Sequence, residues 1–204
     1  MMAAILTGDI INSENYEASE WMPILKNYLS KFGDTPTDWE VYRGDEFQLK
    51  TTAKEALTIA VGLKAHIKTI KGLDVRMSIG LGQETYVGDT VSESNGTAYQ
   101  LSGRTLSTLK KQNRNLSVAT IDQTVNKTIN LVLQLALDFM DHWSPVSAEI
   151  IALYLENPDA QQQEIAEQLQ IKQSAVSQRQ KRARLDLVKQ LLAYYPELIK
   201  QLNS

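Results

Sequence analysis

The stretch QEIAEQLQIKQSAVS, residues 163–177, decides the fold of the last part of the chain. Apolar residues recur along it at helical spacing. Ala166 is small where two helices must cross closely, and Leu169 and Ile171 lie on either side of a short turn. Val176 then returns to the core from the next helix. These residues meet the packing needs of two short helices joined by a tight turn.

Working outward from this stretch, the apolar spacing after Pro145 predicts four helices, over residues 146–155, 161–168, 172–182 and 183–202. The last helix carries an apolar stripe. Its members are Leu185, Val188, Leu192 and Tyr195. This stripe could cover the helical unit, or it could pair two chains into a homodimer.

Residues 163–177 closely resemble the helix-turn-helix of bacterial regulators and of the promoter-reading region of sigma factors. The resemblance implies a helix-turn-helix DNA-binding domain over residues 144–204 whose partner is double-stranded DNA. Two positions depart from the pattern, since Gln170 stands where glycine is frequent and Lys172 where a serine or threonine N-cap is usual. A missing N-cap costs about 1 kcal/mol, which a packed domain tolerates.

In such a domain the second helix of the motif enters the major groove. We expect its polar residues to contact base edges and its basic residues to lie near phosphates. The expected DNA-binding residues are Lys172, Gln173, Ser174, Ser177, Gln178, Lys181 and Arg182. The segment 172–184 has five basic residues and no acidic one, although the whole chain has a formal net charge of -3. A solvated helix face and a protein-interaction module are the alternatives.

The N-terminal part alternates apolar runs typical of strands with amphipathic stretches typical of helices. Strands are predicted over 3–11, 73–81 and 116–121, with a hairpin over 39–50 that turns at Gly44. Helices are predicted over 17–32, 53–70, 97–111 and 124–141. The order favours an α+β fold, a ferredoxin-like palm with helices on one face of its sheet. Because the turn 142–145 breaks the last helix, we place the domain boundary between residues 143 and 144.

Two acidic positions fall on neighbouring parts of the predicted sheet, Asp9 on the first strand and Asp45 at the hairpin turn, with Glu46 as a possible third ligand. Carboxylates held side by side repel each other unless a cation lies between them, and oxygen ligands suit Mg²⁺. These residues are therefore candidate magnesium ligands. The alternative is that Asp9 and Asp45 serve only as turn or cap residues.

The segments TGDII (7–11) and YRGDEF (42–47) look like the two metal-binding strands of class III nucleotide cyclases and of GGDEF-type diguanylate cyclases. The similarity continues through VRMSIGLG (75–82) and GTAYQLSGR (96–104). It implies a cyclase-type palm that binds a nucleotide. The implied nucleotide-binding residues are Arg43, Glu93, Gln100 and Arg104.

Two departures from the cyclase pattern leave open whether the palm catalyses a reaction. Gln100 stands where cyclases have a catalytic asparagine and is one methylene longer. Val41 occupies the place where adenylyl cyclases have a lysine that reads the base. Arg104 matches the cyclase arginine, and arginine suits phosphate geometry.

The combination of GDIINS (8–13), RGDEFQ (43–48) and a terminal helix-turn-helix resembles the bacterial SatD-like proteins across nearly the whole chain. We therefore expect a DNA-binding transcriptional regulator with a nucleotide- or metal-sensing palm. The alternative is a nucleotidyl cyclase, or a related magnesium-dependent phosphoryl-transfer enzyme, that its helix-turn-helix targets. A non-enzymatic interaction scaffold is a third hypothesis.

The composition of the chain is compatible with these hypotheses. Its 204 residues are 43% hydrophobic, enough for a substantial core. There is no cysteine, which excludes disulfides and thiolate metal sites and favours a reducing compartment. The first residues lack the pattern of a signal peptide, and no apolar run is long enough for a membrane span. We therefore expect a cytoplasmic protein.

Overall fold

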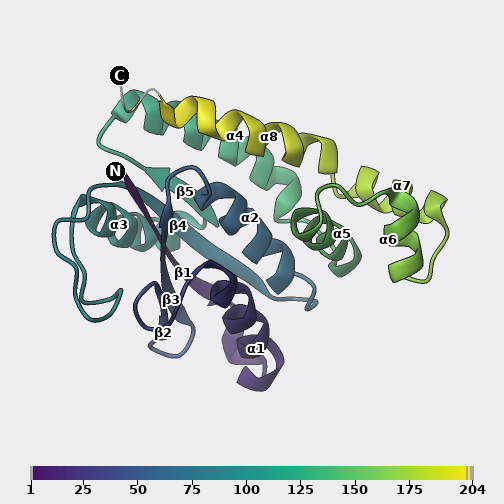
Figure 1. Ribbon diagram of the computed structural model, residues 1–204, viewed down its shortest axis with the longest axis horizontal. Coiled ribbons are helices and arrows are strands. Elements are labelled where there is room, and N and C mark those ends of the chain that lie inside the picture. The colour runs from purple at the N-terminus through teal and green to yellow at the C-terminus, as the bar shows by residue number, and fades with distance from the viewer. Residues whose placement is uncertain (1, 201, 203–204) are drawn as a thin grey trace.

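The computed structural model describes residues 2–200 and 202. Within them a mixed strand and helix portion comes first and a helical portion follows (Figure 1). The first portion contains β1 (Ala3–Ile11), α1 (Ala18–Leu29), β2 (Trp39–Tyr42), β3 (Glu46–Thr52), α2 (Ala56–Ile67), β4 (Asp74–Gly82), α3 (Thr97–Gln112) and β5 (Leu116–Ala119). The helical portion contains α4 (Gln123–Met140), α5 (Pro145–Glu156), α6 (Gln162–Gln168), α7 (Gln173–Arg182) and α8 (Leu185–Lys200). Single 3-10 turns, Ser13–Asn15 and Ser30–Phe32, follow β1 and α1.

The strands and helices predicted from the sequence are confirmed, with ends that differ by at most three residues. Differences of three residues occur at the end of α1, predicted at residue 32, and at both ends of α2, which spans Ala56–Ile67 where the apolar spacing predicts 53–70. The hairpin turn is confirmed as well. Arg43 and Gly44 both have positive φ, 50° and 85°, as tight hairpin turns require.

The five strands form one sheet in the order β2-β3-β1-β4-β5. The central strand β1 pairs antiparallel with β3 on one side and with β4 on the other, and the edge strand β5 is parallel to β4. This register places Asp9 of β1 between Glu46 of β3 and Arg76 of β4. Because directly paired residues lie on the same face of a sheet, these three side chains are neighbours.

Helices cover both faces of this sheet, so the prediction that they cover one face is wrong. On one face α2 packs on Met77 and its alternate neighbours in β4. On the other face α3 packs on β4, where the Ser78 hydroxyl donates to the Ser102 carbonyl oxygen at 2.7 Å. Gly80 supplies the reason, because it presents no side chain and α3 can approach the strand closely.

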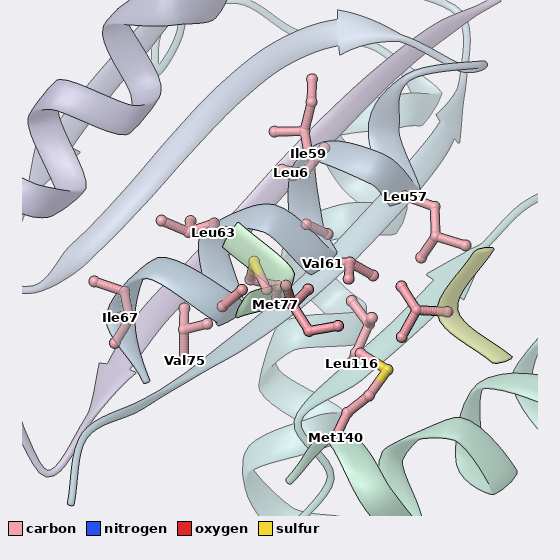
Figure 2. Close-up of a cluster of buried hydrophobic side chains, with 14 of the residues drawn as sticks. Leu6, Leu57, Ile59, Val61, Leu63, Ile67, Val75, Met77, Leu116 and Met140 are labelled. Carbon is pink, nitrogen blue, oxygen red and sulfur yellow. The ribbon is translucent and has the colours of Figure 1, made fainter. Parts of the chain in front are cut away.

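One continuous cluster of buried apolar side chains joins the sheet to the helical portion. Figure 2 shows its centre, where Leu63 of α2 and Met77 of β4 lie near Leu116 of β5 and Met140 at the end of α4. The cluster continues through α5 and α8 to Val176 of α7. The division of the chain between residues 143 and 144 therefore stays a prediction, since a shared core crosses it.

Buried charges link the two portions at the end of α4. The ammonium group of Lys64, which is fully buried, lies 2.6 Å from a carboxylate oxygen of Asp74 and 2.6 Å from one of Asp141. Lys68 lies 3.0 Å from Asp74 and also donates to the Asp141 carbonyl oxygen at 2.8 Å. We call Lys64, Lys68, Asp74 and Asp141 the junction network. It connects α2 and β4 with the residues that lead into α5.

A second link joins the end of α5 to the helices on the sheet. Glu156 forms ion pairs with Lys31, which follows α1, and with His66 of α2. The hydrogen bond from Lys31 lowers the pKa of Glu156 below its usual value, although partial burial acts in the opposite direction. The helical portion is thus attached to the first portion of the chain just before α5 and again at the end of α5.

Among the residues that the structure describes, no helix combines the length and apolar character needed to cross a membrane.

Candidate nucleic-acid interface

A tight left-handed turn joins α6 and α7. Gln170 has φ 53°, the conformation in which glycine is most comfortable. The Ile171 amide donates to the Ala166 carbonyl oxygen at 2.9 Å, and the Gln170 amide donates to that of Glu167 at 3.1 Å. This pair of hydrogen bonds is a Schellman motif, which ends α6 and redirects the chain into α7. It explains why the pattern prefers glycine at position 170.

The packing inferred for the two helices is confirmed. Ala166 and Val176 are buried, and Leu169 and Ile171 pack partly buried against the same cluster. A third helix supports the pair, since α5 packs against α7. The indole nitrogen of Trp143 donates to the Ala183 carbonyl oxygen at 2.9 Å, just after α7 ends. This contact fixes the link between α4 and α5 to the far end of α7.

The outer face of α7 is open to solvent, and Figure 1 shows α6 and α7 at the end of the molecule away from the sheet. Only Val176 of this helix is buried. The residues expected to contact DNA all belong to the exposed class: Lys172, Gln173, Ser174, Ser177, Gln178, Lys181 and Arg182. Lys172 is the N-cap residue and makes no side-chain cap. The polar and basic side chains of this face are therefore accessible from solvent.

Positive charge gathers at the C-terminal end of α7. Its last turn contains Arg179, Lys181 and Arg182. Arg179 turns inward and pairs with Glu149 of α5 at 3.1 Å, so its charge is used within the protein. Lys181 and Arg182 are exposed. Neither Lys181 nor Arg182 forms an ion pair with another residue that the structure describes, so the charges of both remain open to solvent.

Residues 140–189 match the family model of sigma-70, region 4. The matched residues begin at the end of α4 and include α5, α6 and α7 with the first part of α8. The match supports the helix-turn-helix prediction and indicates a DNA-binding unit of the kind found in transcription regulation. No curated protein matched the chain.

The first candidate metal ligand, Asp9, lies in an ion-pair network. Its Oδ2 atom is 3.2 Å from a guanidinium nitrogen of Arg76 and 3.1 Å from the ammonium nitrogen of Lys110 on α3. Lys110 also lies 3.0 Å from Glu46, the possible third ligand. Partial burial lowers the pKa of Lys110, but hydrogen bonds to Glu46 and Asp9 outweigh it and raise the pKa above its usual value. A charged lysine therefore lies between these two carboxylates.

Asp45, the other main candidate ligand, has a different partner. Its carboxylate accepts a hydrogen bond of 2.6 Å from the Ser13 hydroxyl, in the 3-10 turn after β1. In residues 2–200 and 202, no group of three acidic, histidine or cysteine side chains is arranged to hold a metal ion. Oδ1 of Asp9 is buried and receives no hydrogen bond from the described residues. Lys110 and Arg76 would repel a divalent ion there, so the set fits magnesium poorly, and magnesium binding stays a prediction.

The residues implied to bind a nucleotide are all exposed, but they lie on separate elements. Gln100 and Arg104 are one turn apart on α3 and share a face of that helix. Arg43 lies in the β2–β3 turn, and Glu93 lies in the loop before α3. Among the described residues, no hydrogen bond or ion pair joins one member of this set to another. Gln100 and Arg104 are thus the pair that the fold brings together.

Sequence reasoning missed Lys110 and Arg76 beside Asp9, and it missed the junction network. Arg76 could have been found, since it alternates with the apolar residues of β4 and must lie on the face opposite to Met77. Lys64 also carried a signal, because it is a lone lysine within the apolar helix ALTIAVGLKAHI (56–67). Lys110 gave no such signal, since its contact with Asp9 depends on how α3 crosses the sheet.

Proposed function

We propose that this chain is a DNA-binding transcriptional regulator, acting in the bacterial cytoplasm, in which α7 is the recognition helix. The observation that carries this proposal is the exposed face of α7, where amide, hydroxyl and basic side chains stand on a helix-turn-helix scaffold. An internal packing helix would bury such a face or balance its charge with acidic residues. α7 contains no acidic residue, and Val176 is its one buried side chain.

The exposed residues divide into two groups by chemistry. Gln173, Ser174, Ser177 and Gln178 can both donate and accept hydrogen bonds, as base edges in the major groove require. Lys172 at the start of α7, and Lys181 and Arg182 at its end, carry charges that suit phosphates. The first group would select the sequence, and the second would supply affinity that depends on salt.

Removing the two cations at the end of α7 tests the phosphate contacts. We expect Lys181→Ala with Arg182→Ala to weaken binding to every duplex by about tenfold or more at physiological salt. The dependence of log K on log salt should become shallower by about 1.8, since each lost phosphate contact contributes about 0.9. Fluorescence anisotropy with a labelled duplex at several salt concentrations measures both quantities.

Two comparison variants make this titration specific. Lys26→Ala with Lys54→Ala removes the same charge from exposed positions on the sheet portion and should leave binding unchanged. Gln178→Ala should reduce the difference between preferred and random duplexes while leaving the salt dependence intact. If the α7 double variant behaves like the Lys26 and Lys54 variant, α7 does not contact DNA.

For the sheet portion we propose a ferredoxin-like, cyclase-type palm that senses a nucleotide. Support comes from the order β2-β3-β1-β4, with both neighbours of β1 antiparallel, which is the arrangement of a ferredoxin-like sheet. The contacts of Asp9 argue against a metal ion there, because Lys110 and Arg76 already neutralise its carboxylate. Arg104 and Arg43 are exposed and free of ion pairs among the described residues, so their guanidinium groups can donate hydrogen bonds to phosphate oxygens.

The junction network supplies a route from the palm to the recognition helix. It joins β4, a strand of the palm, to Asp141, two residues before Trp143, and Trp143 is bonded to the end of α7. A nucleotide that favours one arrangement of β4 and α2 would thereby favour one orientation of α7. Both portions would then act as a single switch.

Nucleotide binding by the palm can be measured without DNA. We expect calorimetric titration with nucleoside triphosphates to show saturable binding that Arg104→Ala weakens by about tenfold or more. Lys111→Ala, an exposed charge removed from the same helix, should bind as the wild type does. Product formed with Mg²⁺ and lost in Asp45→Ala would favour the nucleotidyl cyclase alternative, whereas absence of binding would contradict nucleotide sensing.

A further inference from the structure

The helices α4 and α8 lie side by side (Figure 1). Both expose apolar side chains on their outer face. Leu131 and Leu135 of α4 are 60% and 68% exposed, and Tyr194 of α8 is 46% exposed. Between the two helices runs an apolar groove of about 570 Å³ that Phe139 and Leu187 help to line. Contiguous apolar surface of this kind typically marks an interaction site.

This outer face is distinct from the stripe of α8 that closes the protein's own core. Leu185, Val188 and Tyr195 are buried and Leu192 is half-buried, so the stripe noticed in the sequence covers the helical unit. Leu187 and Tyr194 point the other way and are left exposed. The chain therefore needs the inner stripe to fold, and the outer face remains for a partner.

The exposed leucines of α4 lie between two opposite charges, and this pattern indicates which kind of partner fits. Lys127, Leu131, Leu135 and Asp138 fall within one face of the helix, because they follow one another at steps of three or four residues. Lys127 and Asp138 are exposed, and neither forms an ion pair within the described part of the chain. Read from either end, the stripe has a charge, two leucines and the opposite charge. It is complementary to itself when one copy runs antiparallel to another.

We propose that the α4–α8 face is the interface of a homodimer in which two copies of α4 pair antiparallel about a twofold axis. Leu131 of each copy packs against the partner's Leu135, and Lys127 of each copy pairs with the partner's Asp138. An interface of this type uses the same patch twice, as a twofold axis requires. The tyrosine and leucine side chains of the two α8 helices extend the contact on either side of α4.

This dimer would present two recognition helices, and so two copies of the proposed DNA-binding surface. α8 has 16 residues and a length of about 24 Å, and α7 lies beyond its first residue. Antiparallel pairing puts the two α7 helices toward opposite ends of the dimer, and dimers of helix-turn-helix units bind paired half-sites on DNA. The use of paired half-sites rests on the proposed function, whereas dimerization measured without DNA tests the interface alone.

Analytical ultracentrifugation over a range of protein concentrations tests the interface. The full chain should sediment as a dimer, and Leu131→Glu with Leu135→Glu should raise the dimer dissociation constant at least about tenfold. Both leucines are exposed, so circular dichroism should show an unchanged fold. Val87→Glu, a substitution at a 64% exposed residue in the loop before α3, should leave the dimer intact.

A charge exchange distinguishes self-pairing from any other partner. Lys127→Asp gives a chain with two acidic ends on the stripe, and Asp138→Lys gives one with two basic ends. Each variant alone should be mainly monomeric, and mixing them should restore a dimer that contains one chain of each. A monomeric wild-type chain, a dimer that survives the two glutamates, or failure of the mixture to associate would each overturn the proposal.

Discussion

Replacing Asp74 by alanine should lower the free energy of unfolding by about 3–5 kcal/mol, because it leaves Lys64 buried with half of its compensating charge removed. The side chain of Lys64 is 0% exposed and lies 2.6 Å from both Asp74 and Asp141. Lys68, nearly buried beside it, loses the same partner. Urea denaturation followed by circular dichroism measures the change.

Two further variants separate this charge effect from a simple loss of contacts. Glu149→Ala breaks the more exposed pair with Arg179 and should cost no more than about 1 kcal/mol. Lys64→Met in the Asp74→Ala background removes the buried charge and should recover part of the lost stability. If Asp74→Ala costs no more than Glu149→Ala, the junction network contributes little to the fold.

Replacing Gly80 by alanine should destabilise the protein by about 3 kcal/mol, as overpacking in a rigid site does. A Cβ atom there would overlap the carbonyl oxygen of Ala98 and would lie 2.6 Å from the backbone nitrogen of Ser102. Both atoms belong to the backbone of α3, so the helix as a whole would have to move. Differential scanning calorimetry should show a clear fall in Tm.

Gly103 provides the control on the same helix. A Cβ atom added there meets nothing within 4 Å, and Gly103 lies inside α3. Gly103→Ala should therefore stabilise the protein by about 0.5–1 kcal/mol, because alanine loses less conformational freedom than glycine on folding. Equal effects of the two substitutions would mean that α3 does not pack closely on β4.

Local patterns carried most of what could be predicted. The turn after α6 and the burial of Ala166 and Val176 depend on residues within one short segment, so their spacing is visible in the sequence. The hairpin at Gly44 is local for the same reason. Elements of this kind are set by helical or strand periodicity and by turn chemistry.

Contacts between distant segments could not be predicted in the same way. The side of the sheet on which α3 packs depends on the small residues Gly80 and Ser102 meeting across a crossover, and periodicity alone does not choose a face. Asp9 illustrates the consequence for sites. Its acidic neighbours were visible in the sequence, but Lys110 reaches it from a helix about 100 residues later in the chain. The spacing of carboxylates in a sequence is therefore a weaker guide to metal binding than the basic residues that the fold places beside them.

Because α5 contacts both α2 and α7, it limits which segments of the protein can be exchanged by engineering. One side of this helix rests on α2, and another supports α7. A DNA-binding domain from another protein, joined after residue 143, would lack the apolar surface that packs against α2. It would also lack the carboxylate of Glu156 that pairs with Lys31 and His66. Variants designed to bind new DNA sequences should therefore retain α5. They should change only the exposed side chains of α7.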